Sequence, residues 1–189
     1  MRALVVGAGA VGGYFGGRLL EANRDVTFLV RPQRAKQLAE SGLRIRSRFG
    51  DVTIPKPPTI LAPTISGAYD LVLLSCKAYD LADAIESFTP AVGPATAILP
   101  LLNGMRHLAA LDERFGQDRV LGGRCFIAAT VNEKREIVHF NDGHAISFGE
   151  RDGTMSDRVM ASRGRLMPHV SRVQTARAAH AVTRISRPR

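Results

Sequence analysis

The chain has 189 residues, 45% of them apolar, which is enough for one buried core of ordinary size and part of a second domain. Its formal charge of +9 would suit a nucleic-acid-binding protein, but residues 162–189 hold seven arginines and no acid, which leaves 19 cations against 17 carboxylates elsewhere. These numbers exclude a basic binding face spread over the folded body, so we expect no nucleic-acid partner.

Nothing in the sequence indicates a membrane or an oxidising compartment. No run of eighteen apolar residues occurs, and the N-terminal stretch becomes glycine-rich too soon for a signal peptide. Cys76 and Cys125 cannot form a disulfide framework, and neither belongs to a CxxC pair. We therefore expect a cytoplasmic protein that neither enters a membrane nor binds a metal.

The N-terminal residues predict a βαβ unit. In chain order they read as a strand, a glycine-rich turn, an amphipathic helix and a second strand, at residues 2–6, 7–13, 14–22 and 26–30. The two strands should be parallel and joined by a right-handed crossover. Pro32 suits the first turn of a second helix, which should end near Ser41, before Gly42.

The remaining elements predict an α/β protein. Alternation between residues 43 and 61, with prolines at 55, 57 and 58, favours a hairpin or a pair of short edge strands. Strands are then expected at 70–75, at 97–101 and from 120, with helices at 80–88 and 107–115. From 124 to 149, alternation around Asn141-Asp142-Gly143 predicts antiparallel strands that close the sheet. The expected fold is a Rossmann-type, doubly wound, mostly parallel sheet.

A glycine-rich loop carries the clearest functional pattern. Gly7-Ala8-Gly9-Ala10-Val11-Gly12 fits G-x-G-x-x-G and lies between a predicted strand and a predicted helix, as in dinucleotide-binding proteins. Gly7 permits a sharp turn, Gly9 lets the backbone approach a pyrophosphate, and Gly12 allows close packing of helix and strand. The phosphates would lie over the unpaired amides of the helix N-terminus. A purely structural glycine turn is the alternative.

The end of the second strand indicates which nicotinamide cofactor binds. NAD enzymes usually place a carboxylate there for the ribose 2′-hydroxyl, whereas NADP enzymes offer an arginine to the 2′-phosphate. Here Arg31 follows the strand directly, Arg34 comes one helical turn later, and no acid occurs before Glu40. We predict NADPH, with Arg31 as the main 2′-phosphate ligand and Arg34 as a secondary one. Two solvated surface charges are the alternative.

Four motifs together resemble the ketopantoate reductase (2-dehydropantoate 2-reductase) family. They are GAGAVGG at the N-terminus, Val30-Arg31, Ser75-Cys76-Lys77-Ala78-Tyr79, and Asn103-Gly104-Met105. In this order they cover residues 1 to about 153. Members of the family reduce 2-dehydropantoate to (R)-pantoate with NADPH, in the pathway to pantothenate, and combine an N-terminal Rossmann domain with a C-terminal helical domain. The resemblance implies that activity here, with a small 2-oxo acid as substrate.

The resemblance also gives roles to three further positions. In the family, the lysine that matches Lys77 lies along the cofactor, and the asparagine that matches Asn103 touches both the nicotinamide ribose and the substrate. Both residues follow predicted parallel strands, where open α/β sheets bind ligands. Ala128 falls near a position at which members of the family contact the cofactor through the backbone. A surface lysine and an Asn-Gly turn are the plain alternatives for Lys77 and Asn103.

The C-terminal part of the sequence departs from the family. The family's general acid is a lysine on an early helix of the C-terminal domain, whereas lysines occur here only at 36, 56, 77 and 134. We therefore identify no catalytic residue. We expect residues 1–153 to form the NADPH-binding domain and residues 154–189 to be a truncated or aberrant remnant, the product of a truncation or a frameshift. Apolar surface left uncovered would favour association with a second copy.

Several alternatives remain open from the sequence. A non-catalytic NADPH-binding module, a related reductase of another small 2-oxo acid, and nucleic-acid binding through the arginine-rich tail compete with the leading hypothesis. Cys76 ends an apolar strand and is interpreted as inert filling rather than as an activated thiol. His139 and His144 flank the predicted turn and do not have metal-ligand spacing.

Overall fold

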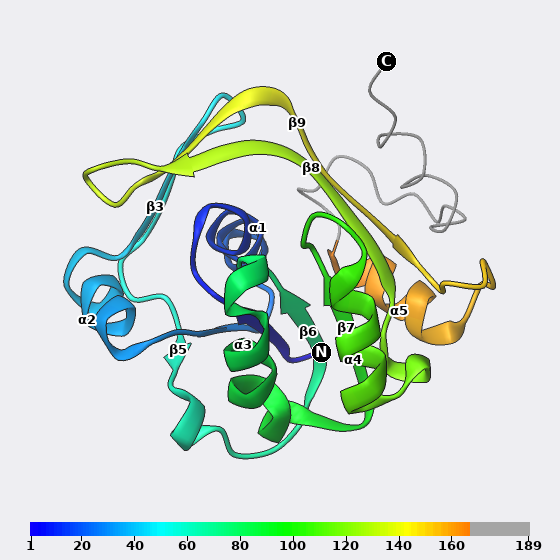
Figure 1. The fold of residues 1–189 in the computed structure, drawn as a ribbon. Coiled ribbons are helices and arrows are strands. Elements are labelled where there is room, and N and C mark those ends of the chain that lie inside the picture. Colours follow the sequence, from blue (N-terminus) through cyan, green and yellow to red (C-terminus); the bar gives the residue numbers. More distant parts are fainter. Residues whose placement is uncertain (167–189) are drawn as a thin grey trace.

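Two sheets enclose helix α1 (Ala10–Glu21) in the computed structural model, which describes residues 1–166 and the side chains of residues 1–162 (Figure 1). The parallel sheet has the order β5-β2-β1-β6-β7, from Thr59–Ile60, Val26–Leu29, Ala3–Val6, Tyr69–Leu74 and Val92–Pro100. The second sheet has the order β4-β3-β9-β8, from Val52–Ile54, Leu43–Ser47, Ile137–Gly149 and Gly122–Val131. The predicted Rossmann-type parallel sheet is confirmed.

Helices cover both faces of the parallel sheet. Alternate residues of β1 point to opposite sides: Val5 packs in the core that contains α1, and Leu4 packs in the core that contains the other two helices of the sheet. Those helices are α3 (Leu81–Phe88) and α4 (Arg106–Phe115). Each of the three helices therefore buries an apolar face against the strands, which makes the sheet doubly wound.

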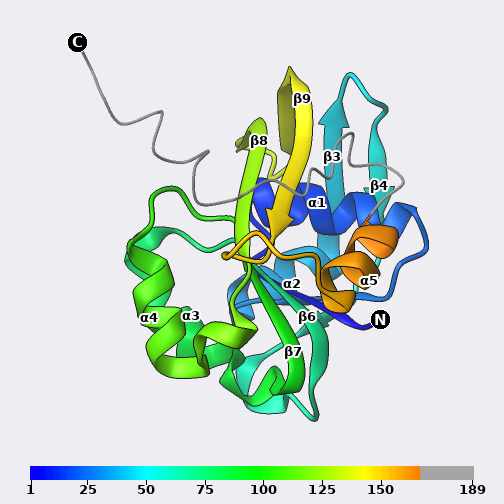
Figure 2. The same ribbon diagram turned by 90° about the vertical axis from the view of Figure 1, so that its right-hand side faces the viewer.

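Helix α1 packs closely against both sheets because glycines line both of its packed sides. A Cβ on Gly12 or Gly16 would meet β1 and β2 side chains, and one on Gly13 or Gly17 would meet isoleucines of the second sheet. Figure 2 shows the strands of the second sheet above α1 and the parallel strands below it. The glycine-rich sequence thus serves two interfaces at once.

The second sheet corrects two sequence-based expectations. The predicted turn at Asn141-Asp142-Gly143 is wrong, because these residues lie inside β9. The hairpin turns instead between Asn132 and Glu136, where the Asn132 side chain accepts from the Glu136 amide and Arg135 adopts a positive φ of 63°. The strands also do not close the parallel sheet. They form a sheet of their own with β3 and β4, the two short strands predicted between residues 43 and 61.

The remaining elements lie at the margins. Residues 59–60, also expected beside β3 and β4, form β5 at the edge of the parallel sheet, next to β2. Helix α2 spans Pro32–Ser41. Helix α5 spans Asp157–Leu166, where the Ser156 hydroxyl accepts from the Val159 amide as a cap. No helix within residues 1–166 is long and apolar enough to cross a membrane. The expectation for the tail beyond residue 166 lies outside the described residues.

Candidate functional site

The ends of four parallel strands form one edge of the sheet, and the predicted ligand-binding residues follow them. The strand register aligns Leu29, Val6, Leu74 and Pro100 across this edge. Arg31, Gly7, Lys77 and Asn103 come one to three residues later in each case. The topology thus brings together residues that are up to 96 positions apart, at the carboxyl edge where open α/β sheets bind ligands.

The glycine-rich loop has the geometry that its sequence predicts. Gly7 has a φ of 91°, which favours glycine, and its amide donates to the Leu29 carbonyl at 3.0 Å. A Cβ on Gly12 would clash with the Ser75 hydroxyl and the Gly7 carbonyl, whereas one on Gly9 would meet no atom within 4 Å. Gly7 and Gly12 are therefore required by the fold. Gly9 is not, and it leaves the backbone open to a ligand.

Ser75 fastens the loop to the neighbouring strand. Its hydroxyl donates to the Val6 carbonyl at 2.8 Å and approaches the Gly7 carbonyl at 3.3 Å. The N-terminus of α1 starts at Gly9, which offers no side-chain cap. Its first amides therefore point out of a rigid turn without a side-chain acceptor, the arrangement that binds phosphate groups. Sequence reasoning quoted Ser75 as part of a motif but missed this role.

Arg31 lies at the predicted edge, but it already has an acidic partner. Its Nη2 is 2.7 Å from Asp80 Oδ1 and 3.9 Å from Asp83 Oδ2, while 71% of its side chain is exposed. The hydrogen bond to Asp80 raises the pKa of the Arg31 guanidinium. Sequence reasoning missed Asp80, although the residue lies just after the SCKAY motif. A phosphate at Arg31 would have to compete with this carboxylate.

Arg34 contacts the glycine-rich loop itself. Its Nε and Nη2 donate to the Ala8 carbonyl at 3.2 and 2.9 Å. Burial, followed by the nearby Arg135, lowers the pKa of its guanidinium. Arg34, expected to be the secondary phosphate ligand, thus contacts the loop directly, whereas Arg31, expected to be the main one, pairs with Asp80.

Lys77 and Asn103 are both exposed at the edge. Lys77 precedes a short 3-10 turn at Ala78–Asp80, and Asn103 lies in a bend before Gly104, whose φ is 80°. Neither side chain hydrogen-bonds within residues 1–162. The bend means that Asn103 also fits an Asn-Gly turn, and both side chains are free to meet a ligand.

Ala128 lies at a bulge in β8. Strand β8 leaves the end of β7, where Cys125 Sγ is 3.7 Å from the Leu101 carbonyl, and then packs along α1. The pairing with β9 shifts between Ile127 and Ala129, so the Ala128 amide donates to the Asn141 side chain at 2.8 Å. Asn141, which sequence reasoning assigned to a turn, instead supports this bulge.

The cysteines are partly buried, and His139 and His144 form hydrogen bonds inside the fold. Burial raises the pKa of the Cys76 thiol to about 11 and also raises that of Cys125, so neither is an activated thiolate at neutral pH. His139 and His144 lie within β9 rather than beside a turn. Nδ1 of His144 hydrogen-bonds the Tyr14 hydroxyl at 2.7 Å, and Nε2 of His139 donates to Asn141. No cluster of three metal-ligating residues occurs in the described part of the chain.

The chain is similar in sequence and structure to known reductases. The uncharacterized oxidoreductase YkpB of Bacillus subtilis is 44% identical over 161 residues, which are 85% of this chain and 52% of that protein. The crystal structure of 2-dehydropantoate 2-reductase from Geobacter metallireducens has a TM-score of 0.80 and 33% identity, covering 88% of this chain and 55% of that one.

A third similarity concerns the fold alone. D-mandelate dehydrogenase, solved with NADH and anilino(oxo)acetate, has a TM-score of 0.74 at 21% identity, covering 88% of this chain and 53% of that one.

The chain thus spans about half the length of the relatives it matches. Residues 3–153 match the family model described as ketopantoate reductase PanE/ApbA. Because this match covers well over half of the sequence, the chain belongs to the ketopantoate reductase family of oxidoreductases.

Proposed function

We propose that the chain binds NADPH along the carboxyl edge of its parallel sheet. The observation that carries the proposal is the contrast among the loop glycines: Gly7 and Gly12 are fixed by the fold, while Gly9 faces open space. A turn that served only to connect β1 to α1 would not need that opening, whereas a pyrophosphate resting on the backbone would.

The residues at the edge fit the parts of a dinucleotide. Gly7 to Gly12 would hold the pyrophosphate at the start of α1. Arg31 follows β2, the place from which NADP enzymes offer an arginine to the adenosine 2′-phosphate, and it would bind that group here. Lys77, Asn103 and the Ala128 backbone would face the remainder. When bound, the cofactor supplies a hydride. Asn103 can donate and accept hydrogen bonds without placing a charge beside the reacting carbon.

Family membership supports reduction of 2-dehydropantoate to (R)-pantoate, the step that serves pantothenate synthesis, as the reaction of the whole enzyme. The Geobacter protein bears that enzyme's name. The similarity to YkpB, an oxidoreductase of unassigned reaction, keeps another small 2-oxo acid as an alternative substrate. We assign residues 1–153 to the cofactor-binding domain. A turnover assay with 2-dehydropantoate separates a reductase from a module that only binds the cofactor.

Fluorescence titration with NADPH and NADH, on the wild type and on Gly9→Ala, tests the proposal. Because a Cβ at Gly9 would meet no atom of the described residues within 4 Å, the variant should keep the Tm of the wild type. It should bind NADPH at least about tenfold more weakly, since the methyl group would occupy the place where the pyrophosphate approaches. Unchanged affinity in Gly9→Ala, or no binding by the wild type, would refute the dinucleotide site.

The same titration tests the choice of cofactor. Asp80→Asn removes the carboxylate that occupies Arg31 and should increase affinity for NADPH severalfold without increasing affinity for NADH. Asp83→Asn is the matched control, because Asp83 is 83% exposed and lies 3.9 Å from the guanidinium rather than 2.7 Å. Equal effects of the two variants would show that general charge, not the Arg31 pair, controls cofactor choice.

A further inference from the structure

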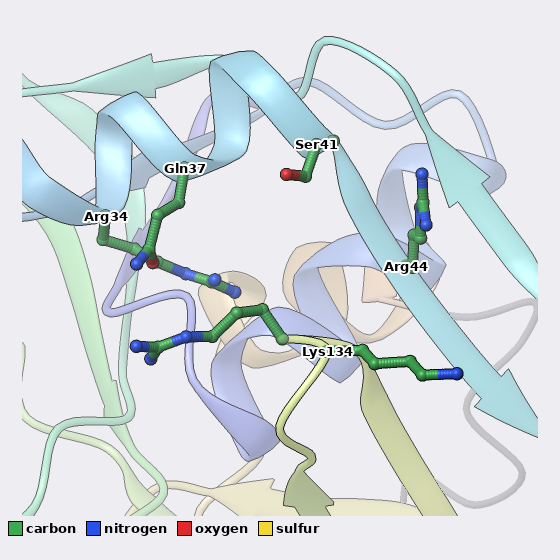
Figure 3. Close-up of a pocket in the computed structure, with 7 residues that line it drawn as sticks. Arg34, Gln37, Ser41, Arg44 and Lys134 are labelled. Atoms are coloured by element: carbon green, nitrogen blue, oxygen red, sulfur yellow. The ribbon is translucent and has the colours of Figure 1, made fainter.

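Cations from three distant segments line a crevice beside the glycine-rich loop. It has a volume of about 120 Å³ and lies between α2, the start of β3 and the β8–β9 turn. Its charged lining residues are Arg34, Arg44, Lys134 and Arg135. Figure 3 shows Arg34 and Gln37 projecting from α2 toward the turn that carries Lys134. Residues about 100 positions apart in sequence, such as Arg34 and Arg135, thus line one small space.

The cations of this crevice form no ion pair with a carboxylate in the described residues. Within residues 1–162, no carboxylate lines the crevice either. Glu136, next to Arg135 in sequence, is instead bound by Arg46 at 3.0 Å. Like charges that share a small space repel one another, and an anion bound among them would reduce that cost.

Arg34 is held in place at the edge of the crevice and lies close to another of its cations. It is partly buried, its Nε and Nη2 donate to the Ala8 carbonyl, and, besides burial, the charge that lowers its pKa among the described residues is that of Arg135, another cation. A fixed guanidinium offers its remaining donors in a set direction, which suits an oxyanion more than a diffuse counter-ion. Gln37 and Ser41 supply neutral hydrogen-bonding groups on the same side of α2.

We propose that this crevice is a binding site for a phosphate dianion. Small-molecule sites usually measure roughly 300–1,000 Å³, so a space of about 120 Å³ takes one charged group rather than a whole metabolite. The group is either inorganic phosphate or the 2′-phosphate of a cofactor whose pyrophosphate lies on the adjoining loop, in which case Arg34 and Arg135 would take the role proposed above for Arg31. The second source rests on the proposed function, whereas the first does not.

Calorimetric titration of the full chain with sodium phosphate, NADPH and NADH tests the proposal. The variants are Arg135→Gln, Lys134→Gln as a second lining variant, and Lys56→Gln as a control. All three side chains are exposed, each change removes one positive charge, and Lys56 lies outside the crevice. The Tm of each variant checks that it folds, and Lys134→Gln replaces Arg135→Gln if the latter perturbs the turn.

The lining variants should bind either phosphate or NADPH about tenfold more weakly than the wild type, because they lose a charge-assisted hydrogen bond. Lys56→Gln should bind both with unchanged affinity. Weaker binding of inorganic phosphate identifies the free ion as ligand. Weaker binding of NADPH with unchanged NADH identifies the 2′-phosphate. Phosphate binding that depends on Arg135 in a chain that binds neither dinucleotide would uphold the crevice and refute the proposed function. Lining variants that bind both anions like the wild type would overturn the crevice.

Discussion

Helix α1 meets its two sheets through different kinds of contact. Toward the parallel sheet, Gly12 abuts backbone and the Ser75 hydroxyl, and Gly16 abuts the Phe28 ring. Toward the second sheet, Gly13 and Gly17 abut the flexible ends of isoleucine side chains, and buried polar groups lie alongside. The parallel-sheet contact leaves no room for adjustment, whereas the other tolerates small shifts and sets its register by hydrogen bonds.

The largest effect on stability should come from a single added methyl group, placed in one variant on the side of α1 that faces the parallel sheet and in another on the side that faces the second sheet. Gly12→Ala should lower the free energy of unfolding by about 3 kcal/mol, because neither the Gly7 carbonyl nor the tied Ser75 hydroxyl can move away. Gly13→Ala should change it by less than about 1 kcal/mol, since the Ile137 terminus can rotate and alanine favours the helix. Urea denaturation followed by circular dichroism measures both. Equal losses would contradict the asymmetry.

A smaller effect should come from the polar contact with the second sheet. Tyr14→Phe removes a buried hydrogen bond of 2.7 Å to His144 and should cost about 1–2 kcal/mol of unfolding free energy. Tyr69→Phe in the parallel sheet is the matched control, because Tyr69 is also buried and its hydroxyl makes no hydrogen bond within residues 1–162. If Tyr69→Phe is as costly as Tyr14→Phe, the polar contact does not distinguish the two sides.

The smallest effect should come from the end of β9, where the chain leaves the second sheet. Glu150 accepts from Arg158 Nε at 2.6 Å, and this bond lowers the pKa of the carboxyl. A carboxyl whose pKa is lowered in the folded state stabilises the fold at pH values above its unfolded pKa of about 4. This contribution is lost as the pH falls through the lower pKa of the folded state. Glu150→Gln should therefore cost under about 1 kcal/mol at pH 7 and nothing at low pH.

Glu133→Gln is the control for this measurement. Glu133 is exposed in the β8–β9 turn and forms no ion pair within residues 1–162. Its substitution should leave the pH dependence of the Tm unchanged. A pH-independent loss in Glu150→Gln would show that the carboxyl acts through packing alone.

The parallel sheet could be predicted because its signals are local. Its central strands are buried on both faces and read as unbroken apolar runs, and the glycine loop lies between adjacent elements. The strands of the second sheet could be predicted, but their turn and their grouping into a separate sheet could not, because the actual turn contains no glycine and uses the Asn132 side chain with a left-handed Arg135. The Asn-Asp-Gly sequence that resembles a turn stays extended because Asn141 supports the Ala128 bulge.

The candidate site also has a part that could be predicted from local sequence and a part that could not. Gly7, Gly9 and Gly12 follow one another in sequence, so their roles could be predicted from spacing alone. The partner of Arg31 could not, because Asp80 lies 49 residues away and reaches it only through the arrangement of β2 and β6. The crevice at Arg135 brings together still more distant segments, and a charge count along the chain gives no sign of it.

The position of α1 between the sheets has a consequence for how the chain folds. Ile137 and His144 complete the packing of a helix that begins at residue 10, so the first helix of the chain depends on its later strands. Contacts of such high sequence separation slow folding, because a long loop must close before they form. During synthesis, the first βαβ unit should therefore stay incompletely packed until β9 has emerged from the ribosome.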